Sequence, residues 1–218
     1  MKKGIQLKNL KSPVSEQFKI LRTNIEFSSL DYEIKTIVVT SSLAGEGKST
    51  VVSNLGVTMA ISGKQVVIVD CDFRKPTIHN RFSLSNSKGL TNILIQNREI
   101  DKIVITTNIP NLYVIPCGPI CPNPSELLGS KKMKEFLNEL TTRFDIVLID
   151  TPPVLYISDA QIVSALSQGT IIVTAYGKTE KKSLLIAKEK IEKVGGTVLG
   201  VVINKIPGKY NGDYYIDV

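Results

Sequence analysis

Six short apolar runs, most of them rich in β-branched residues, alternate with helical stretches along this chain of 218 residues. Few of the runs alternate apolar with polar residues, which indicates strands that are buried on both faces. Strands are predicted at 35–40, 65–69, 111–115, 145–149, 170–174 and 198–203. Helices are predicted at 13–29, 48–62, 90–96, 125–141, 159–166 and 181–194. The alternation predicts an α/β fold: a mostly parallel sheet with helices on both faces, joined by right-handed crossovers.

A glycine-rich turn joins the first predicted strand to the helix that follows it. Its sequence, Gly-Glu-Gly-Lys-Ser-Thr at 45–50, is typical of a phosphate-binding loop, although Ser42 stands where the full pattern has its first glycine. Backbone N–H groups and the helix N-terminus would hold phosphate, Lys48 would reach the β- and γ-phosphates, and Ser49 would ligate Mg²⁺. The predicted nucleotide-binding residues are Ala44, Gly45, Glu46, Gly47, Lys48, Ser49 and Thr50.

Three aspartates stand at the ends of two further strands. Asp70 and Asp72 follow the run at 65–69, and Asp150 follows the run at 145–149. The carboxyl ends of parallel strands open on one edge of the sheet, so these acids are expected beside the phosphate loop, with Asp72 and Asp150 as metal ligands. Asp70 is assigned as the base that accepts a proton from an attacking hydroxyl, and Asp72 is the alternative. Arg74 and Lys75 either neutralise phosphate or form a solvated surface pair.

Composition restricts the chemistry further. His79 is the only histidine, which excludes histidine-based triads within one chain, and we expect it in a surface loop. The three cysteines, including Cys117 and Cys121, are expected to be free thiols. The net charge of +7 is spread along the chain, and no nucleic-acid partner is expected. No stretch approaches the roughly 20 apolar residues of a membrane span, so a cytoplasmic protein is expected.

The two ends of the chain carry features outside the nucleotide core. Val14, Phe18, Leu21 and Ile25 form one apolar stripe on the predicted helix 13–29. Three of the seven tyrosines, Tyr210, Tyr214 and Tyr215, lie in the last nine residues among glycine, asparagine and aspartate, which favour exposure. Such a cluster can be a packed end, a docking strand or a phosphate acceptor, and the nucleotide site favours the acceptor. We therefore predict one domain over 1–206 and a flexible tail over 207–218.

In combination, these features resemble the bacterial tyrosine kinases, or BY-kinases, and in particular the detached cytoplasmic kinase of capsule and exopolysaccharide systems in Gram-positive bacteria. The likeness covers nearly the whole chain. It rests on the terminal tyrosines and on segments 41–50 (Walker A), 66–76 (Walker A′), 118–128 and 144–153 (Walker B). The resemblance implies a Rossmann-like P-loop fold and autophosphorylation of the tail in trans with ATP and Mg²⁺.

The resemblance also implies partners. Members of this family assemble as rings through an ExxRxxR helix motif, here Glu16, Lys19 and Arg22, with lysine in place of the first arginine. A membrane adaptor would recruit the kinase to the inner face of the cell membrane and activate it, and a cognate phosphotyrosine phosphatase would reverse the reaction. The competing hypothesis is an ATPase of the MinD/ParA type. Those proteins carry a signature lysine where this chain has Leu43, which favours the kinase. An inactive scaffold is disfavoured because Lys48, Ser49 and the acids are present.

Overall fold

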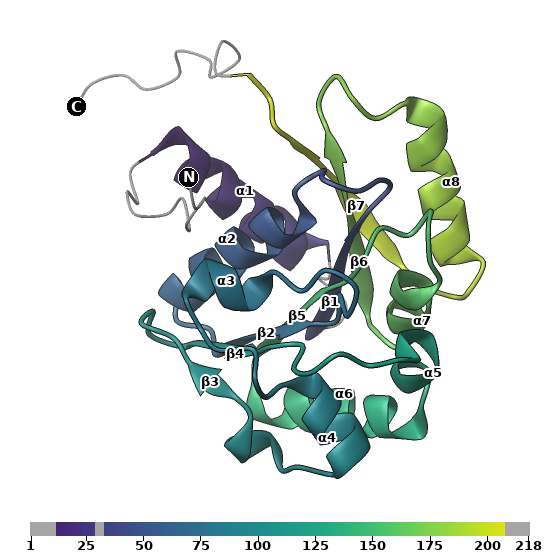
Figure 1. Ribbon diagram of the computed structural model, residues 1–218. Coiled ribbons are helices and arrows are strands. Elements are labelled where there is room, and N and C mark those ends of the chain that lie inside the picture. Colours follow the sequence, from purple (N-terminus) through teal and green to yellow (C-terminus); the bar gives the residue numbers. More distant parts are fainter. Residues whose placement is uncertain (1–11, 29–32, 208–218) are drawn as a thin grey trace.

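A single mixed sheet forms the centre of the protein (Figure 1). The computed structural model describes residues 12–28 and 33–207, and within them seven strands pair in the order β3-β4-β2-β5-β1-β6-β7. Their bounds are β1 Thr36–Ser41, β2 Val66–Asp70, β3 Ile105–Thr106, β4 Leu112–Ile115, β5 Ile146–Asp150, β6 Gly169–Ala175 and β7 Val198–Asn204. All pairs are parallel except β3 with β4. The predicted α/β class is confirmed.

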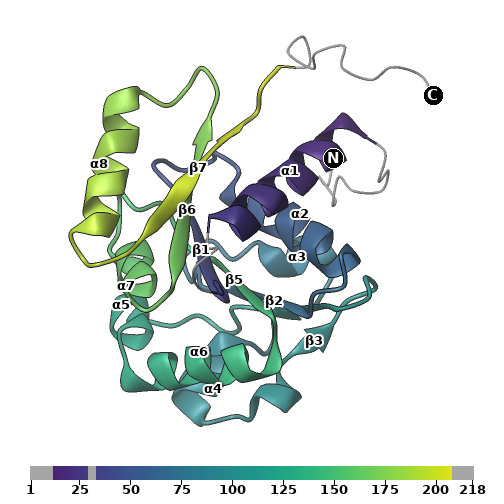
Figure 2. The same ribbon diagram turned by 180° about the vertical axis from the view of Figure 1, so that it is seen from behind.

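Helices cover both faces of this sheet (Figures 1 and 2). One face carries α1 (Pro13–Phe27), α2 (Lys48–Ile61) and α3 (Ile78–Phe82). The other face carries α4 (Leu90–Gln96), α5 (Pro124–Leu128), α6 (Lys131–Arg143), α7 (Asp159–Ala165) and α8 (Lys181–Glu192). The 3₁₀ helix η2 (Ile100–Lys102) precedes β3. None of the described helices is both long enough and apolar enough to cross a bilayer.

The core consists of two layers because successive strand residues point to opposite faces. In β2, Val66 and Ile68 pack with the α1–α3 layer, whereas Val67 and Val69 pack with the α4–α7 layer. Helix α2 is buried along nearly its whole length, since it lies between the sheet and α1. The apolar runs that form β1, β2, β5 and β6 therefore do mark strands with two buried faces, as predicted, whereas the edge strand β7 contains no buried residue.

Helix α1 is attached through part of its predicted apolar stripe. Ile25 is buried, and Phe18 and Leu21 pack against the same core cluster. Val14, the first residue of the predicted stripe, is instead 40% exposed. Ser12 caps the helix, because its hydroxyl accepts a hydrogen bond from the Ser15 backbone N–H. The helix ends at Phe27, two residues before the predicted end.

Several local predictions were wrong. The helix predicted at 125–141 is two helices, α5 and α6, because Ser130 caps a new helix by accepting the Met133 N–H. Strand β3 and helix α3 were not predicted, and His79 lies in α3 rather than in a loop. The prediction of free thiols, by contrast, is confirmed, and all three cysteines are buried. Residues 208–218, with the three terminal tyrosines, lie outside the described residues, so the boundary at 206 and the tail stay predictions.

Gly89 offers a test of how tightly the α4 layer packs. A Cβ at this position would lie 2.2 Å from the Pro116 carbonyl oxygen and 2.3 Å from the Gly118 nitrogen. Because both are backbone atoms, Gly89→Ala is expected to lower the free energy of unfolding by about 3 kcal/mol, measured by urea denaturation. Gly200→Ala is the control, since no atom lies within 4 Å of its Cβ position. Equal destabilisation by both substitutions would contradict this packing argument.

Candidate active site

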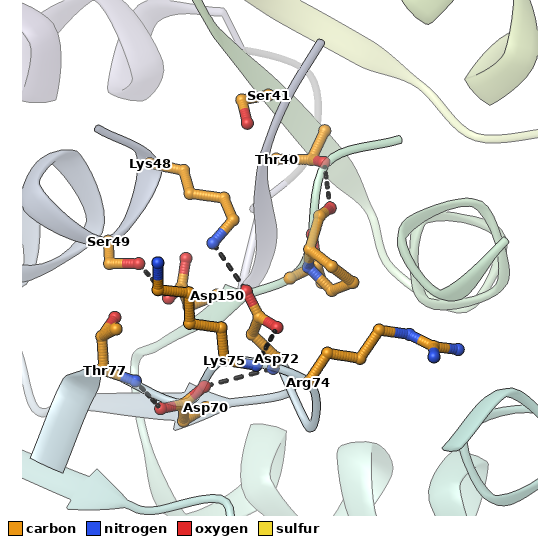
Figure 3. Close-up of polar contacts among 12 residues, drawn as sticks. Thr40, Ser41, Lys48, Ser49, Asp70, Asp72, Arg74, Lys75, Thr77 and Asp150 are labelled. Atoms are coloured by element: carbon orange, nitrogen blue, oxygen red, sulfur yellow. Dashed lines mark hydrogen bonds and ion pairs between the residues drawn. The ribbon is translucent and has the colours of Figure 1, made fainter. Parts of the chain in front are cut away.

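Three strand ends meet at one edge of the sheet (Figure 3). β5 lies between β1 and β2, so the segments after these three strands are neighbours. The Cα atoms of Asp70 and Asp150 are register partners in the β2–β5 pair. The structure therefore brings the phosphate loop and the three predicted acids together, because all of them follow parallel strands.

The loop after β1 has the geometry of a phosphate cradle. Gly45 and Gly47 both have left-handed backbone angles, with φ of 78° and 101°. A Cβ on Gly47 would lie 2.0 Å from the Asn204 side-chain nitrogen, so this position needs glycine for space as well as for conformation. Helix α2 begins at Lys48, and its N-terminus faces the loop. The loop can therefore present backbone N–H groups to an anion, as its sequence predicts.

Lys48 reaches across the site to an acid from the next strand. Its Nζ lies 2.8 Å from Asp72 Oδ2, and the two side chains are 13% and 4% exposed. Burial lowers the pKa of Lys48, but the carboxylates of Asp150 and Asp72 more than compensate, and the pKa lies above its ordinary value. The ammonium group is therefore charged at neutral pH and available to phosphate oxygens.

Ser49 and Asp150 form the second contact of the site. The Ser49 hydroxyl donates to Asp150 Oδ2 over 2.6 Å. Asp150 is fully buried, and burial raises its pKa to about 6 even though Lys48 and Ser49 act in the opposite direction. Its other oxygen, Oδ1, is buried and has no hydrogen-bond partner among the described residues. An unsatisfied buried carboxylate oxygen beside a serine hydroxyl fits a divalent cation or its bound water.

Asp70 is held differently from the other two acids. Its Oδ1 accepts the Asp72 N–H, and its Oδ2 accepts the N–H groups of Thr77 and Ile78 at 3.0 and 3.1 Å. The residue is fully buried, and burial together with the Asp150 charge raises its pKa to about 8. Asp70 thus fixes the path of the chain from β2 into α3.

The contacts that hold the phosphate loop from behind were not predicted from the sequence. Glu46 is buried, and its carboxylate accepts hydrogen bonds from the Leu43 N–H at 2.7 Å and from Thr179 Oγ1. The Asn204 side chain donates to the Glu46 carbonyl over 2.9 Å, and Lys205 Nζ donates to the Gly45 carbonyl. Asn204 ends the strand β7, so its position at a strand end was the one signal in the sequence that could have placed it here.

The two cations of the Walker A′ segment point in different directions (Figure 3). Arg74 turns away from the phosphate loop, and its Nε lies 3.4 Å from the buried Asp159 carboxylate, which also accepts a hydrogen bond from Ser125 Oγ. The Lys75 side chain points toward the Ser49–Asp150 contact. Both residues are exposed, and Arg74 pairs with a buried acid, so neutralisation of phosphate by Lys75 stays a prediction.

The remaining described site residues lie on α1, apart from the phosphate loop. Lys19 Nζ is 2.5 Å from the Glu16 carboxylate, and Arg22 Nε is 3.7 Å from the Glu26 carboxylate. Spacings of three residues put Glu16, Lys19 and Arg22 along one side of the helix. Their predicted role in subunit contacts stays a prediction.

Comparison with known proteins identifies the family. The family described as "AAA domain" matches residues 34–194. Tyrosine-protein kinase YwqD of Bacillus subtilis is 44% identical over 89% of this chain and 82% of its own length. The putative tyrosine-protein kinase CapB of Staphylococcus aureus is 40% identical over 94% of this chain and 90% of its own length. The chain belongs to the bacterial tyrosine kinases.

Solved structures agree with this membership. The BY-kinase fold of this chain matches the chimerical protein CapA2B2 with a TM-score of 0.89 and 40% identity, covering 93% of this chain and 89% of that one. It matches the kinase domain of the Escherichia coli tyrosine kinase ETK with a TM-score of 0.90 and 28% identity, over 97% and 83% of the two chains. MinD of Pyrococcus horikoshii, at 22% identity and a TM-score of 0.69, shares the fold. The MinD type of ATPase, the competing hypothesis, is thus less similar to this chain than the tyrosine kinases are.

Proposed function

We propose that this BY-kinase transfers the γ-phosphoryl group of ATP to tyrosines of its own C-terminal tail, in trans between subunits, and thereby regulates capsule or exopolysaccharide synthesis. One observation carries the proposal: a charged lysine and two strand-end aspartates converge on a phosphate loop in a chain that is 44% identical to a protein named a tyrosine kinase. The acceptors would be Tyr210, Tyr214 and Tyr215.

The nucleotide would lie on residues 44–50, with Lys48 binding the β- and γ-phosphates. Ser49 and Asp150 would hold Mg²⁺, since the unpartnered Asp150 Oδ1 and the Ser49 hydroxyl suit an oxygen-ligand cation. The described residues contain no group of three or more His, Cys, Asp or Glu side chains arranged to hold a metal, and Mg²⁺ usually completes its shell with water and phosphate. When bound, Mg²⁺ would neutralise charge on the phosphates.

The proton of the attacking tyrosine requires an acceptor, because its ordinary pKa is near 10. We propose Asp72 for this role, in preference to the Asp70 of the sequence prediction, with Asp70 as a positioning residue. Two observations support the change. Both acids are buried, but the two oxygens of Asp70 are bound to backbone N–H groups, whereas Asp72 has only Oδ1 on a backbone N–H. Its Oδ2 accepts from Lys48 beside the phosphate loop.

The function is tested by incubating the purified chain with Mg²⁺ and labelled ATP, with and without the cytoplasmic segment of its membrane adaptor, and mapping the label. We expect label on the tail tyrosines and its removal by a phosphotyrosine phosphatase. Release of free phosphate without labelled protein would instead support a MinD-type ATPase.

Helix α1 would form the contact between subunits of a ring. Its outer surface combines the charged residues Lys19 and Arg22 with the apolar side chains Ile20 and Phe27, which are 50% and 65% exposed. Such a mixed patch on a helix is suited to association with a second subunit.

Reversing the two α1 charges together, Lys19→Glu with Arg22→Glu, is expected to reduce the assembly to single chains, because acidic groups would replace both basic groups that α1 offers to its partner. Multi-angle light scattering measures the mass. The control is Lys181→Glu with Lys182→Glu, which makes the same charge change at the exposed start of α8. An assembly mass that is unchanged in the α1 variant would reject this interface.

A further inference from the structure

Arg81 is a half-buried cation near the phosphate loop. It belongs to α3, whose first N–H groups are held by Asp70, so the helix is fixed to the end of β2. Its Nη2 donates to Thr50 Oγ1 over 2.8 Å. Thr50 is the third residue of α2, directly after Lys48 and Ser49. Arg81 therefore reaches the first turn of the nucleotide-binding helix.

The guanidinium group makes no close ion pair in the described part of the chain, although the charge of the more distant Asp150 carboxylate acts on it. Its Nε is buried and has no hydrogen-bond partner there, and no described carboxylate lies within 4.0 Å of its nitrogens. The partner that it does have, the Thr50 hydroxyl, is neutral. A partly desolvated guanidinium with an unused N–H is costly to keep unless an anion completes its contacts.

The position of Thr50 indicates which anion this is. Ser49 Oγ points to Asp150, on the metal side of the loop. Thr50 is one residue further along, about 100° around the helix. Its Oγ1 lies 4.0 Å from the position that a Cβ on Gly47 would take, and the Asn204 side-chain nitrogen lies 2.0 Å from the same position. In a loop of this pattern the N–H groups would cradle the α- and β-phosphates and Lys48 would bind the β- and γ-phosphates, so we place the Thr50 hydroxyl on the α side.

We propose that Arg81 binds the α-phosphate of the nucleotide, together with the Thr50 hydroxyl. Its Nη2 donates to Thr50 Oγ1, and the remaining N–H groups at the end of the guanidinium donate to an oxygen of the phosphate. Arg81 is thus a nucleotide-positioning residue beyond the phosphate loop itself. The inference rests on the proposed function only in taking an adenine nucleotide as the ligand, and it is tested by binding without any phosphoryl transfer.

Calorimetric titration with Mg²⁺ and ADP compares Arg81→Leu with Arg98→Leu, an exposed arginine next to α4 that serves as the charge-matched control. We expect about a tenfold rise in Kd for Arg81→Leu and less than a twofold change for Arg98→Leu. Replacing one α-phosphate oxygen of ADP by sulfur gives two diastereomers, whose Kd values report on the contact between Arg81 and the α-phosphate. The ratio of their Kd values should change at least threefold in Arg81→Leu and stay constant in Arg98→Leu.

Arg81→Gln separates phosphate binding from support of Thr50. Glutamine keeps an N–H donor for Thr50 but removes the charge, so it should weaken ADP binding as much as leucine does. If Arg81→Gln bound ADP as tightly as the unmodified protein, Arg81 would only support Thr50 and the proposal would be overturned. A folded variant with an unchanged diastereomer ratio would overturn it as well, and Arg81→Gln provides this measurement if Arg81→Leu does not fold.

Discussion

Lys48→Met is expected to reduce tail labelling by at least a hundredfold. Methionine has about the length of lysine but no charge, so the change removes the ammonium group and leaves the helix start in place. That group lies among Asp70, Asp72 and Asp150, which keep it charged despite its burial. Losing one preorganised cation at transferring phosphate costs on the order of 10²–10³ in rate. Single-turnover labelling with saturating Mg²⁺ and ATP measures the change.

Lys64→Met is the matched control, because Lys64 follows the other end of the same helix and is exposed. A helix of 14 residues places the two lysines about 20 Å apart, so Lys64 is beyond contact with the phosphates. We expect labelling within twofold of the unmodified protein. If Lys48→Met retained more than a third of the labelling, the transfer site would have to lie elsewhere.

The sequence allowed the framework of the site to be predicted because its signals are local. An apolar β-branched run that ends in aspartate marks both a buried strand and an acid at its carboxyl end, so Asp70, Asp72 and Asp150 could be placed at one edge. The phosphate loop carried its own glycine pattern. These predictions required only that neighbouring parallel strands end at the same edge.

The partners of these residues could not be predicted in the same way. Glu46 is bound by Thr179 and Asn204, Arg74 by Asp159, and Arg81 by Thr50, all contacts between distant parts of the chain. The pairs of side chains that come into contact depend on the order of the strands and on the geometry of the crossovers. Neither can be read from a single sequence. The missed break between α5 and α6 differs, because Ser130 is a local capping signal that the apolar pattern obscured.

The structure thus divides the two aspartates of the Walker A′ segment into different environments. Asp70 is bound to three backbone N–H groups, and Asp72 is bound to one backbone N–H and to the ammonium group of Lys48. A lysine that moves onto phosphate would release one Asp72 oxygen. Asp70 would need to break the turn into α3 before it could contact a tyrosine.

Asp72→Asn is therefore expected to slow labelling by about 10²–10⁴, the usual contribution of a general base, while Mg²⁺·ADP binds within a few-fold of normal. Asp70→Asn should retain labelling within about tenfold. Its single carbonyl oxygen cannot accept all three N–H groups, so we expect it to lower the free energy of unfolding by about 1–3 kcal/mol. Single-turnover labelling and urea denaturation of both variants separate the two roles, since asparagine preserves shape in each case. Loss of labelling in Asp70→Asn, with labelling retained in Asp72→Asn, would assign the base to Asp70 and make Asp72 the positioning residue.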